Sequence, residues 1–273
     1  MIPAKFEYEV AGSVQEAIDL LGSREDAKLL AGGHSQIPAM KLRIARPGTL
    51  VDIGRIGELS YVREDGDTIA IGALTRHHDV ATSDLVHDRC GILAFAAAQI
   101  GDPQVRHRGT VGGSVSHGDP ASDLPGVLLT LDAELVATGP GGERRIPAAD
   151  FFTGVFETAL GPQDVLTEIR VPVLSGGWSY LKFARRAQDW ATVGVAAVAS
   201  NGGANVGLVS MGGTPLRAKA VEQALADGAD PAAAAEKADE GTEPSSDVAG
   251  SADYRRHLAR VLTRRALEQA LSG

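Results

Sequence analysis

Two short glycine-bearing stretches, far apart in the sequence, constrain this chain more than any other feature. The first stretch consists of Ala31, Gly32, Gly33, His34, Ser35, Gln36 and Ile37. The second follows Gly109 and consists of Thr110, Val111, Gly112, Gly113 and Ser114. Glycine lacks Cβ, so the chain can turn through positive φ and let an anion approach main-chain N–H groups, and an adjacent hydroxyl adds a donor. Two such loops suit a diphosphate, although either Gly-Gly pair alone is compatible with an ordinary turn.

Composition and charge narrow the class of protein. A chain of 273 residues is long enough for two domains with cores of their own, and 44% hydrophobic with 22% charged residues is typical of a globular protein. The net charge of −9 argues against a general affinity for nucleic acid or anionic membranes. One cysteine, Cys90, excludes an internal disulfide and a cysteine-ligated cluster built from this chain alone. If the protein works with an iron–sulfur cluster, that cluster belongs to a partner.

The N-terminal segment and the hydropathy pattern bear on location. Residues 1–7 show no basic start followed by an apolar core, and no apolar run reaches the length that a bilayer requires. We therefore expect a cytoplasmic protein without a membrane span.

The first 55 residues predict a small β-α-β unit. Ser13 to Glu16 has the pattern of a capping box, and the apolar residues that follow predict a helix ending near Gly22. Short apolar runs over Lys28–Ala31 and Leu50–Ile53 predict the strands.

A second, mostly antiparallel lobe is expected up to Pro172. Alternating residues around an Asp-Gly turn predict a hairpin over Tyr61–Gly72. A helix is expected from about Cys90 to Ile100. Further strands are expected over Val127–Leu131, Ala133–Thr138, Arg144–Ile146 and Asp164–Pro172.

The character of the chain changes after a short Ser-Gly-Gly linker at 175–177. Three strands are expected, over Trp178–Arg185, Val193–Ala199 and Asn205–Met211. The alanine-rich stretch 219–238 is helix-prone, 240–251 is acidic and expected to be mobile, and 254–271 has the pattern of a basic amphipathic helix.

Read together with their surroundings, the motifs resemble a known family. They are Ala31 to Ser35, Met40 to Arg43, Gln104 to Arg106, Gly109 to Ser114, Asp119 to Pro125, Lys182 to Arg186, Asp189 to Ala191 and Tyr254 to Leu258. Their order and spacing resemble the FAD-binding medium subunit of molybdenum hydroxylases, and within these the carbon monoxide dehydrogenase medium chain family. The resemblance covers nearly the whole chain.

The resemblance implies a fold and a set of partners. The fold is α+β, with a two-lobed FAD-binding domain of the vanillyl-alcohol-oxidase (PCMH) type over 1–174, its lobes spanning about 1–55 and 56–174. A CO dehydrogenase flavoprotein C-terminal-like α+β domain with an antiparallel three-stranded sheet follows over 175–273. Such subunits assemble with a molybdopterin-bearing large subunit and a small subunit carrying [2Fe–2S] clusters, commonly as a dimer of heterotrimers.

The same resemblance implies roles for individual residues. The first loop would hold one phosphate of FAD, and the second loop the other phosphate and the ribityl side. Asp123 would accept hydrogen bonds from FAD hydroxyls, with helix capping as the alternative. Leu166 is either an adenine-side contact or a core leucine. Lys182 is either a cation that raises the flavin potential or a surface lysine of a strand.

The stacking partner of the flavin stays open. Ile100 occupies the position where relatives of the xanthine dehydrogenase type place an aromatic residue, and an aliphatic side chain cannot offer that contact. Trp190 and Tyr180 are candidates, although buried aromatics usually serve packing.

The resemblance implies an oxidoreductase subunit that passes electrons from partner [2Fe–2S] clusters through FAD to an external acceptor, while substrate is oxidised in the molybdenum subunit. Neither a catalytic residue nor a metal-ligand set is expected, and His34 is expected to act through its backbone. The alternatives are a stand-alone flavin oxidoreductase, which would need an acid or base over the flavin, and a cofactor-free assembly module, against which the intact glycine loops argue.

Overall fold

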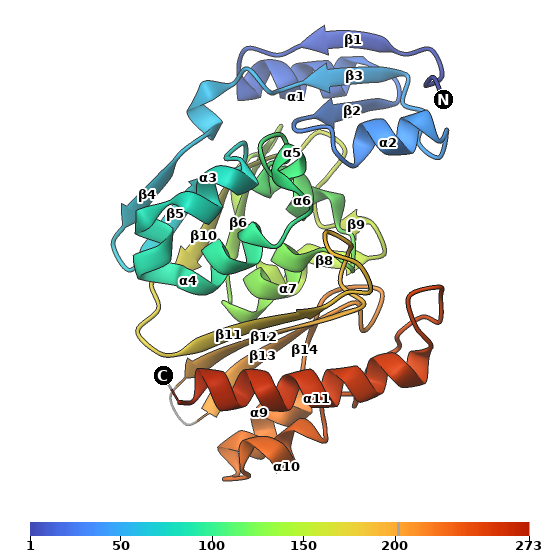
Figure 1. Ribbon diagram of the computed structural model, residues 1–273. Helices are drawn as coiled ribbons and strands as arrows, with labels where there is room; N and C mark the ends of the chain where they lie inside the picture. Colours follow the sequence, from blue (N-terminus) through green and yellow to red (C-terminus); the bar gives the residue numbers. More distant parts are fainter. Residues whose placement is uncertain (201–202, 273) are drawn as a thin grey trace.

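The computed structural model describes residues 1–200 and 203–272. Within these residues the strands form four sheets, ordered β1-β3-β2, β4-β5-β10-β6-β7, β11-β12-β13-β14 and β8-β9. In Figure 1 the small N-terminal sheet lies at the top, the five-stranded sheet with its helices in the middle, and the third sheet with the C-terminal helix at the bottom. The mixture of helices with mostly antiparallel sheets confirms the predicted α+β class.

The N-terminal unit is a three-stranded parallel sheet with its helices. Its elements are β1 (Glu7–Val10), α1 (Val14–Ser23), β2 (Ala27–Leu30), α2 (Gln36–Lys41) and β3 (Thr49–Asp52). The central strand β3 pairs in parallel with both β1 and β2. The side chain of Ser13 caps α1 by accepting from the Glu16 N–H, so the predicted β-α-β unit forms. Strand β1 was not predicted, because none of its four residues is buried and the segment therefore lacks a strong apolar pattern.

The middle unit is an antiparallel sheet covered by helices. Its sheet strands are β4 (Val62–Asp65), β5 (Thr68–Gly72), β6 (Glu134–Gly139), β7 (Gly142–Pro147) and β10 (Val165–Pro172). The remaining elements are the short 3₁₀ helix Gly57–Leu59, α3 (His77–Thr82), α4 (Asp84–Ala98), α5 (Pro103–Arg106), α6 (Val111–His117), α7 (Asp123–Thr130), α8 (Ala148–Phe151), β8 (Phe152–Gly154) and β9 (Glu157–Thr158).

Two expectations for this unit were wrong. The apolar run Val127–Leu131 lies in α7 and its C-cap rather than in a strand; every residue of α7 is buried, so the run shows no periodicity that separates helix from strand. The helix expected from Cys90 begins earlier, at Asp84 after the capping Ser83, and Cys90 sits at a kink with φ −152° and ψ 59°.

The C-terminal unit is a sheet between helices. It comprises β11 (Trp178–Phe183), β12 (Val193–Ser200), β13 (Gly203–Val209), β14 (Leu216–Arg217), α9 (Lys219–Ala226), α10 (Pro231–Ala235) and α11 (Ala252–Ala270). Helices α9 and α11 contact this sheet, and α7 of the middle unit also packs on β12 and β13. The expected three-stranded sheet gains a fourth, two-residue strand, β14. The alanine-rich stretch divides into α9 and α10 around Gly228 and Pro231, residues that interrupt helices.

The segment expected to be mobile is tied down in the structure. Asp247 accepts two hydrogen bonds of 2.8 Å from the Arg255 guanidinium on α11, and the backbone of Val248 accepts from Arg185. The guanidinium of Arg255 is almost fully buried, so this segment is held by a charge-assisted contact that composition did not reveal.

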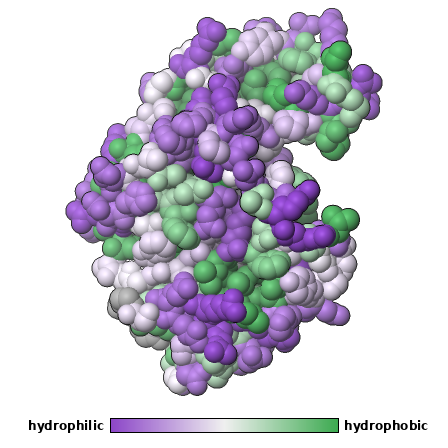
Figure 2. Space-filling view, in the orientation of Figure 1, coloured by the Kyte–Doolittle hydropathy of each residue, from purple (hydrophilic) through white to green (hydrophobic). Residues whose placement is uncertain are grey.

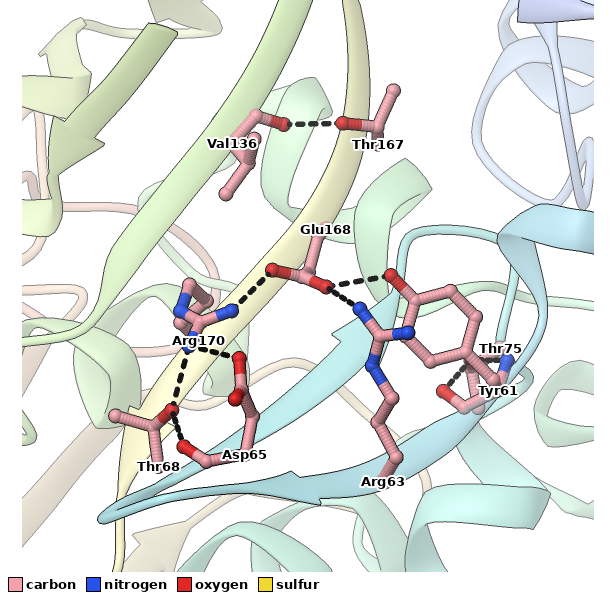
Figure 3. A network of polar contacts seen from close by, with 9 residues as sticks. All are labelled: Tyr61, Arg63, Asp65, Thr68, Thr75, Val136, Thr167, Glu168 and Arg170. Atoms are coloured by element: carbon pink, nitrogen blue, oxygen red, sulfur yellow. Dashed lines mark hydrogen bonds and ion pairs between the residues drawn. The ribbon is translucent and has the colours of Figure 1, made fainter. Parts of the chain in front are cut away.

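A polar network holds the edge of the five-stranded sheet together (Figure 3). Glu168 of β10 accepts hydrogen bonds from the Tyr61 hydroxyl at 2.7 Å, from Arg63 at 3.2 Å and from Arg170 at 2.9 Å. Arg170 also reaches Asp65 at 2.6 Å. The network therefore connects β10 with β4 across β5.

The network determines the protonation behaviour of its members. Burial alone would raise the pKa of Glu168, but hydrogen bonds from Tyr61 and Arg170 and the charges of Arg170 and Arg63 lower it below its usual range. Burial, followed by the hydrogen bond to Glu168, raises the pKa of Tyr61 to about 12. Glu168 is thus ionised, and Tyr61 neutral, across the physiological range.

We predict that Glu168→Gln lowers the free energy of unfolding by about 1–3 kcal/mol at pH 7, because it removes the acceptor of charge-assisted hydrogen bonds. The pKa of Glu168 is lower in the folded than in the unfolded chain, so its contribution is present above the unfolded value and is lost as pH falls through the folded value. Urea unfolding of both proteins at pH 7 and at pH 3–4 measures this, and the difference between them should shrink in acid.

Glu64→Gln serves as the control, because Glu64 forms an ion pair with Arg89 in which both side chains are nearly half exposed. Exposed pairs contribute little, so this variant should change stability by at most about 0.5 kcal/mol. Equal effects of the two substitutions would contradict the importance of the buried network.

Candidate functional site

A cavity of about 810 Å³ lies between the N-terminal and middle units and extends to β11. In Figure 2 the surface is hollowed between the N-terminal part and the rest of the molecule. The volume lies in the range of cavities that bind organic cofactors. Its wall includes β2, both glycine-bearing loops, the loop after β9, and Lys182 of β11.

The two glycine-bearing loops lie directly against each other in this wall. A Cβ atom on Gly32 would fall 2.3 Å from the carbonyl oxygen of Arg108 and 2.8 Å from Cα of Gly109. A Cβ on Gly113 would lie 4.0 Å from Cβ of Ala31. The two backbones therefore touch at a point where Gly32 leaves no room for a side chain, as expected for loops that serve one ligand.

The first loop presents unused main-chain donors. Among the residues that the structure describes, no acceptor takes the N–H groups of Gly32, Gly33, His34 or Ser35. Gly33 has φ +77°, in the left-handed region that favours glycine. A run of free amides in such a turn forms a concavity suited to an anion.

The second loop differs from this expectation, because its amides are already engaged. The N–H groups of Val111 and Gly112 donate to the carbonyls of Thr75 and Ala73 at 3.0 and 2.9 Å. Those of Gly113 and Ser114 donate to the side chain and the carbonyl of Thr110 at 3.1 and 3.0 Å. The exception is the N–H of Thr110, for which the described residues provide no acceptor. For a ligand, this loop therefore offers the hydroxyls of Thr110 and Ser114 and one main-chain donor.

Most of the sequence-predicted residues line this cavity, and two do not. Those in the wall are Ala31, Gly32, Gly33, His34, Ser35, Gln36, Ile100, Thr110, Gly112, Gly113, Ser114, Asp123, Leu166 and Lys182. Val111 is fully buried in the main core, and Ile37 packs its Cγ1 near Gly33. Neither residue is part of the cavity wall.

A buried charged pair crosses the wall between α7 and β11. Nζ of Lys182 lies 2.9 Å from Oδ2 of Asp123 and 3.3 Å from the carbonyl oxygen of Gln99. The hydroxyl of Tyr180 donates to Oδ1 of Asp123 at 2.5 Å. Burial raises the pKa of Asp123, whereas Lys182 and Tyr180 act in the opposite direction.

This pair changes two expectations. Lys182 is not a surface lysine, since its side chain is only 7% exposed, and its charge is compensated by Asp123. Asp123 is the first residue of α7, and the N-cap position belongs to Ser122. Both carboxylate oxygens of Asp123 accept hydrogen bonds from β11, so this side chain serves the contact between the units rather than a helix cap. Tyr180 is fully committed to this network, whereas Trp190 lines the cavity with 62% of its surface exposed.

The structure adds residues to the wall that sequence reasoning missed. They include Lys28, His77, Ser116, His117, Phe156, Thr158 and Asp164. None stands in a motif of its own. Lys28 comes from β2 and Asp164 from the loop before β10, and the others come from α3, α6 and the β8–β9 hairpin.

Among the described residues, no group of three or more His, Cys, Asp or Glu side chains is placed to hold a metal ion. No helix among them is both long and apolar enough to cross a bilayer.

Comparison with known families decides the identity. Residues 4–174 match the FAD binding domain in molybdopterin dehydrogenase, and residues 178–270 match the CO dehydrogenase flavoprotein C-terminal domain. The chain belongs to the carbon monoxide dehydrogenase medium-chain family, the FAD-binding medium subunits of molybdenum hydroxylases. It is an oxidoreductase subunit, and its cofactor is FAD.

Individual relatives are similar over their whole lengths. The carbon monoxide dehydrogenase medium chain of Hydrogenophaga pseudoflava is 43% identical, with 99% of this chain and 98% of the relative covered. The glyceraldehyde dehydrogenase medium chain of Sulfolobus acidocaldarius is 39% identical, with 98% and 99% covered.

Solved structures agree with this membership. Carbon monoxide dehydrogenase from Hydrogenophaga pseudoflava superposes with a TM-score of 0.95 at 45% identity, covering 99% of this chain and 98% of the other. Quinoline 2-oxidoreductase from Pseudomonas putida 86 superposes with a TM-score of 0.93 at 32% identity, covering 99% and 98%.

We predict that Gly32→Ala abolishes FAD retention by this chain. The methyl group would meet the backbone of Arg108 at 2.3 Å, and backbone cannot move aside as a flexible side chain can, so the loops must separate. The flavin content of the purified protein and its thermal midpoint report the effect. Gly57→Ala is the matched control, since a Cβ there meets nothing within 4 Å. Full flavin content in the Gly32 variant would show that contact between the loops is dispensable.

Proposed function

We propose that the cavity between the units holds FAD and that the chain relays electrons from a [2Fe–2S] partner to an external acceptor. The observation that carries the proposal is the run of free amides from Gly32 to Ser35 at the point where the two loops touch. This run fits a pyrophosphate, since neutral donors in a concave turn bind an anion without any cationic side chain. The hydroxyls of Thr110 and Ser114 add donors from the opposite loop.

The wall beyond this point suits the rest of the cofactor. Leu166 and Ile100 offer apolar surface, and Asp123 retains lone pairs besides those used by Tyr180 and Lys182. FAD, when bound, supplies the redox chemistry. The chain contributes binding, orientation and a local field, while the organic substrate is oxidised in a partner that bears molybdopterin.

The partners follow from the same proposal. This chain has one cysteine, buried Cys90, whose thiol pKa burial raises to about 12, so it supplies neither a redox thiol nor a set of cluster ligands. A large molybdenum subunit and a small [2Fe–2S] subunit would complete the electron path, assembled as a dimer of heterotrimers. Support comes from relatives named as medium chains of dehydrogenases.

Comparing the isolated chain with its complex tests the proposal. The isolated chain is expected to bind FAD, with absorbance near ~450 nm, and to oxidise no organic substrate without partners. Addition of copurified large and small subunits should allow the substrate of the complex to bleach this absorbance. Substrate turnover by the isolated chain would establish a stand-alone flavin oxidoreductase instead.

We predict that Lys182→Met lowers the reduction potential of bound flavin by an amount on the order of 30 mV, which is about 1.4 kcal/mol for two electrons. At a pH above the pKa of Asp123, which burial raises, the substitution leaves this carboxylate in the cavity wall without its compensating charge, and an extra negative charge disfavours reduction. The double variant Lys182→Met with Asp123→Asn removes both charges and should return the potential toward the wild-type value. Potentials are measured by dye-coupled reductive titration, and a double variant no different from the single one would contradict the pairing.

A further inference from the structure

His77 is a buried residue of the cavity wall to which the proposed electron relay assigns no task. It is 4% exposed and opens α3 after Arg76. Its neighbour His78 lies outside the cavity wall and stacks on His107, with ring centroids 3.9 Å apart. The two adjacent histidines therefore differ in what they face, and only His77 faces the cavity.

The backbone fixes His77 at the entry to the second glycine-bearing loop. The N–H of His77 donates to the carbonyl of Gly109 at 3.1 Å, and Arg76 forms a bridge with Thr110. The guanidinium of Arg76 also donates to the carbonyl of Arg108, the group that meets Gly32. His77 thus stands beside the point where the two loops touch.

The absence of a side chain at Gly109 leaves one edge of the imidazole uncovered. A Cβ on Gly109 would lie 2.8 Å from Cδ2 and 3.1 Å from Nε2 of His77. Both residues line the cavity. The Nε2 edge of the ring therefore faces space that an ordinary residue in place of Gly109 would fill.

The other ring nitrogen determines where the proton sits. Nδ1 of His77 is buried, and among the described residues it has no hydrogen-bond partner. A neutral imidazole carries one N–H, and a buried N–H without an acceptor costs about 1–3 kcal/mol. The proton is therefore placed on Nε2, which makes this edge a donor.

The ring is neutral at physiological pH. Burial, followed by the charges of Arg76 and Arg106 and the proximity of His34, lowers the pKa of His77 to about 4. These groups belong to the residue before α3, to α5 and to the first loop. The ring consequently offers a hydrogen bond rather than a positive charge.

We propose that Nε2–H of His77 donates a hydrogen bond to the pyrophosphate of bound FAD, making His77 a binding residue between the two loops. This inference rests on the proposed FAD site. It explains why Nδ1 of His77 is buried without a partner among the described residues while the Nε2 edge is uncovered at the point where the two loops touch. It also adds a side-chain donor on the side where the amides of the second loop are engaged.

The first test measures FAD affinity of the cofactor-stripped full chain by fluorescence quenching. His77→Leu should weaken binding roughly 10- to 100-fold, the range for a hydrogen bond to a charged group. His77→Gln, which keeps a donor, should bind between the wild type and His77→Leu. His78→Leu, the matched control next to it, should bind as the wild type does. Equal affinity of wild type and His77→Leu overturns the inference.

A second measurement separates a hydrogen bond from mere packing. The ³¹P resonances of bound FAD should shift in His77→Gln relative to wild type and stay in place in His78→Leu. Unchanged resonances in His77→Gln overturn the contact with the pyrophosphate.

A third measurement observes the His77 ring in the wild-type protein and uses the variant only to assign its signal. In wild-type protein labelled with ¹⁵N-histidine, the ring of His77, assigned by its absence from His77→Gln, should show the proton on Nε2, and this signal should move when FAD is added. A proton on Nδ1 overturns the inference. If the wild-type chain does not bind FAD at all, the proposed function fails first, which distinguishes the two failures.

Discussion

The site depends on the contact between two stretches of backbone at Gly32. The carbonyl of Arg108 occupies the space where any other residue would carry its Cβ. This contact brings the free amides of the first loop to the hydroxyls of the second and closes one end of the cavity. It also places Arg76 and His77 beside both loops, because they bond to the same turn. The N-terminal unit is also held over the middle unit by an apolar core in which Ile18 and Val51 pack with Leu74 and Val165.

The opposite end of the site is fixed by charge rather than by close backbone contact. Asp123 begins α7 in the middle unit, while Lys182 and Tyr180 belong to β11 of the C-terminal unit. A buried carboxylate is stable when it is paired and hydrogen-bonded, and each partner here comes from the other unit. The C-terminal unit therefore contributes directly to the cavity wall through Lys182.

Patterns that depend on neighbours in the sequence were predicted well. The capped helix α1, the hairpin around Gly66, and the strands β6 and β10 formed as expected, because alternation and turn residues act over a few positions. Elements whose residues show no alternation of apolar and polar side chains were predicted wrongly or not at all. The run from Val127 is buried on all sides and forms a helix where a strand was expected. Strand β1 has no buried residue, and β14 has two residues, too few for a recognisable pattern. The extent of the domains, 1–174 and 175–273, stays a prediction of the sequence.

The sequence alone determined which chemical groups are available and which family the chain resembles. It contains glycine loops with adjacent hydroxyls, one cysteine, and motifs that identify a family and its cofactor. Only the tertiary structure decided how these groups are used. It showed which amides remain free, since those of Val111 to Ser114 bond to the protein and those of Gly32 to Ser35 do not. It also paired Lys182 with Asp123 and uncovered one edge of His77. The physical reason is that hydrogen bonds between segments far apart in the chain depend on distances that exist only after the units have packed.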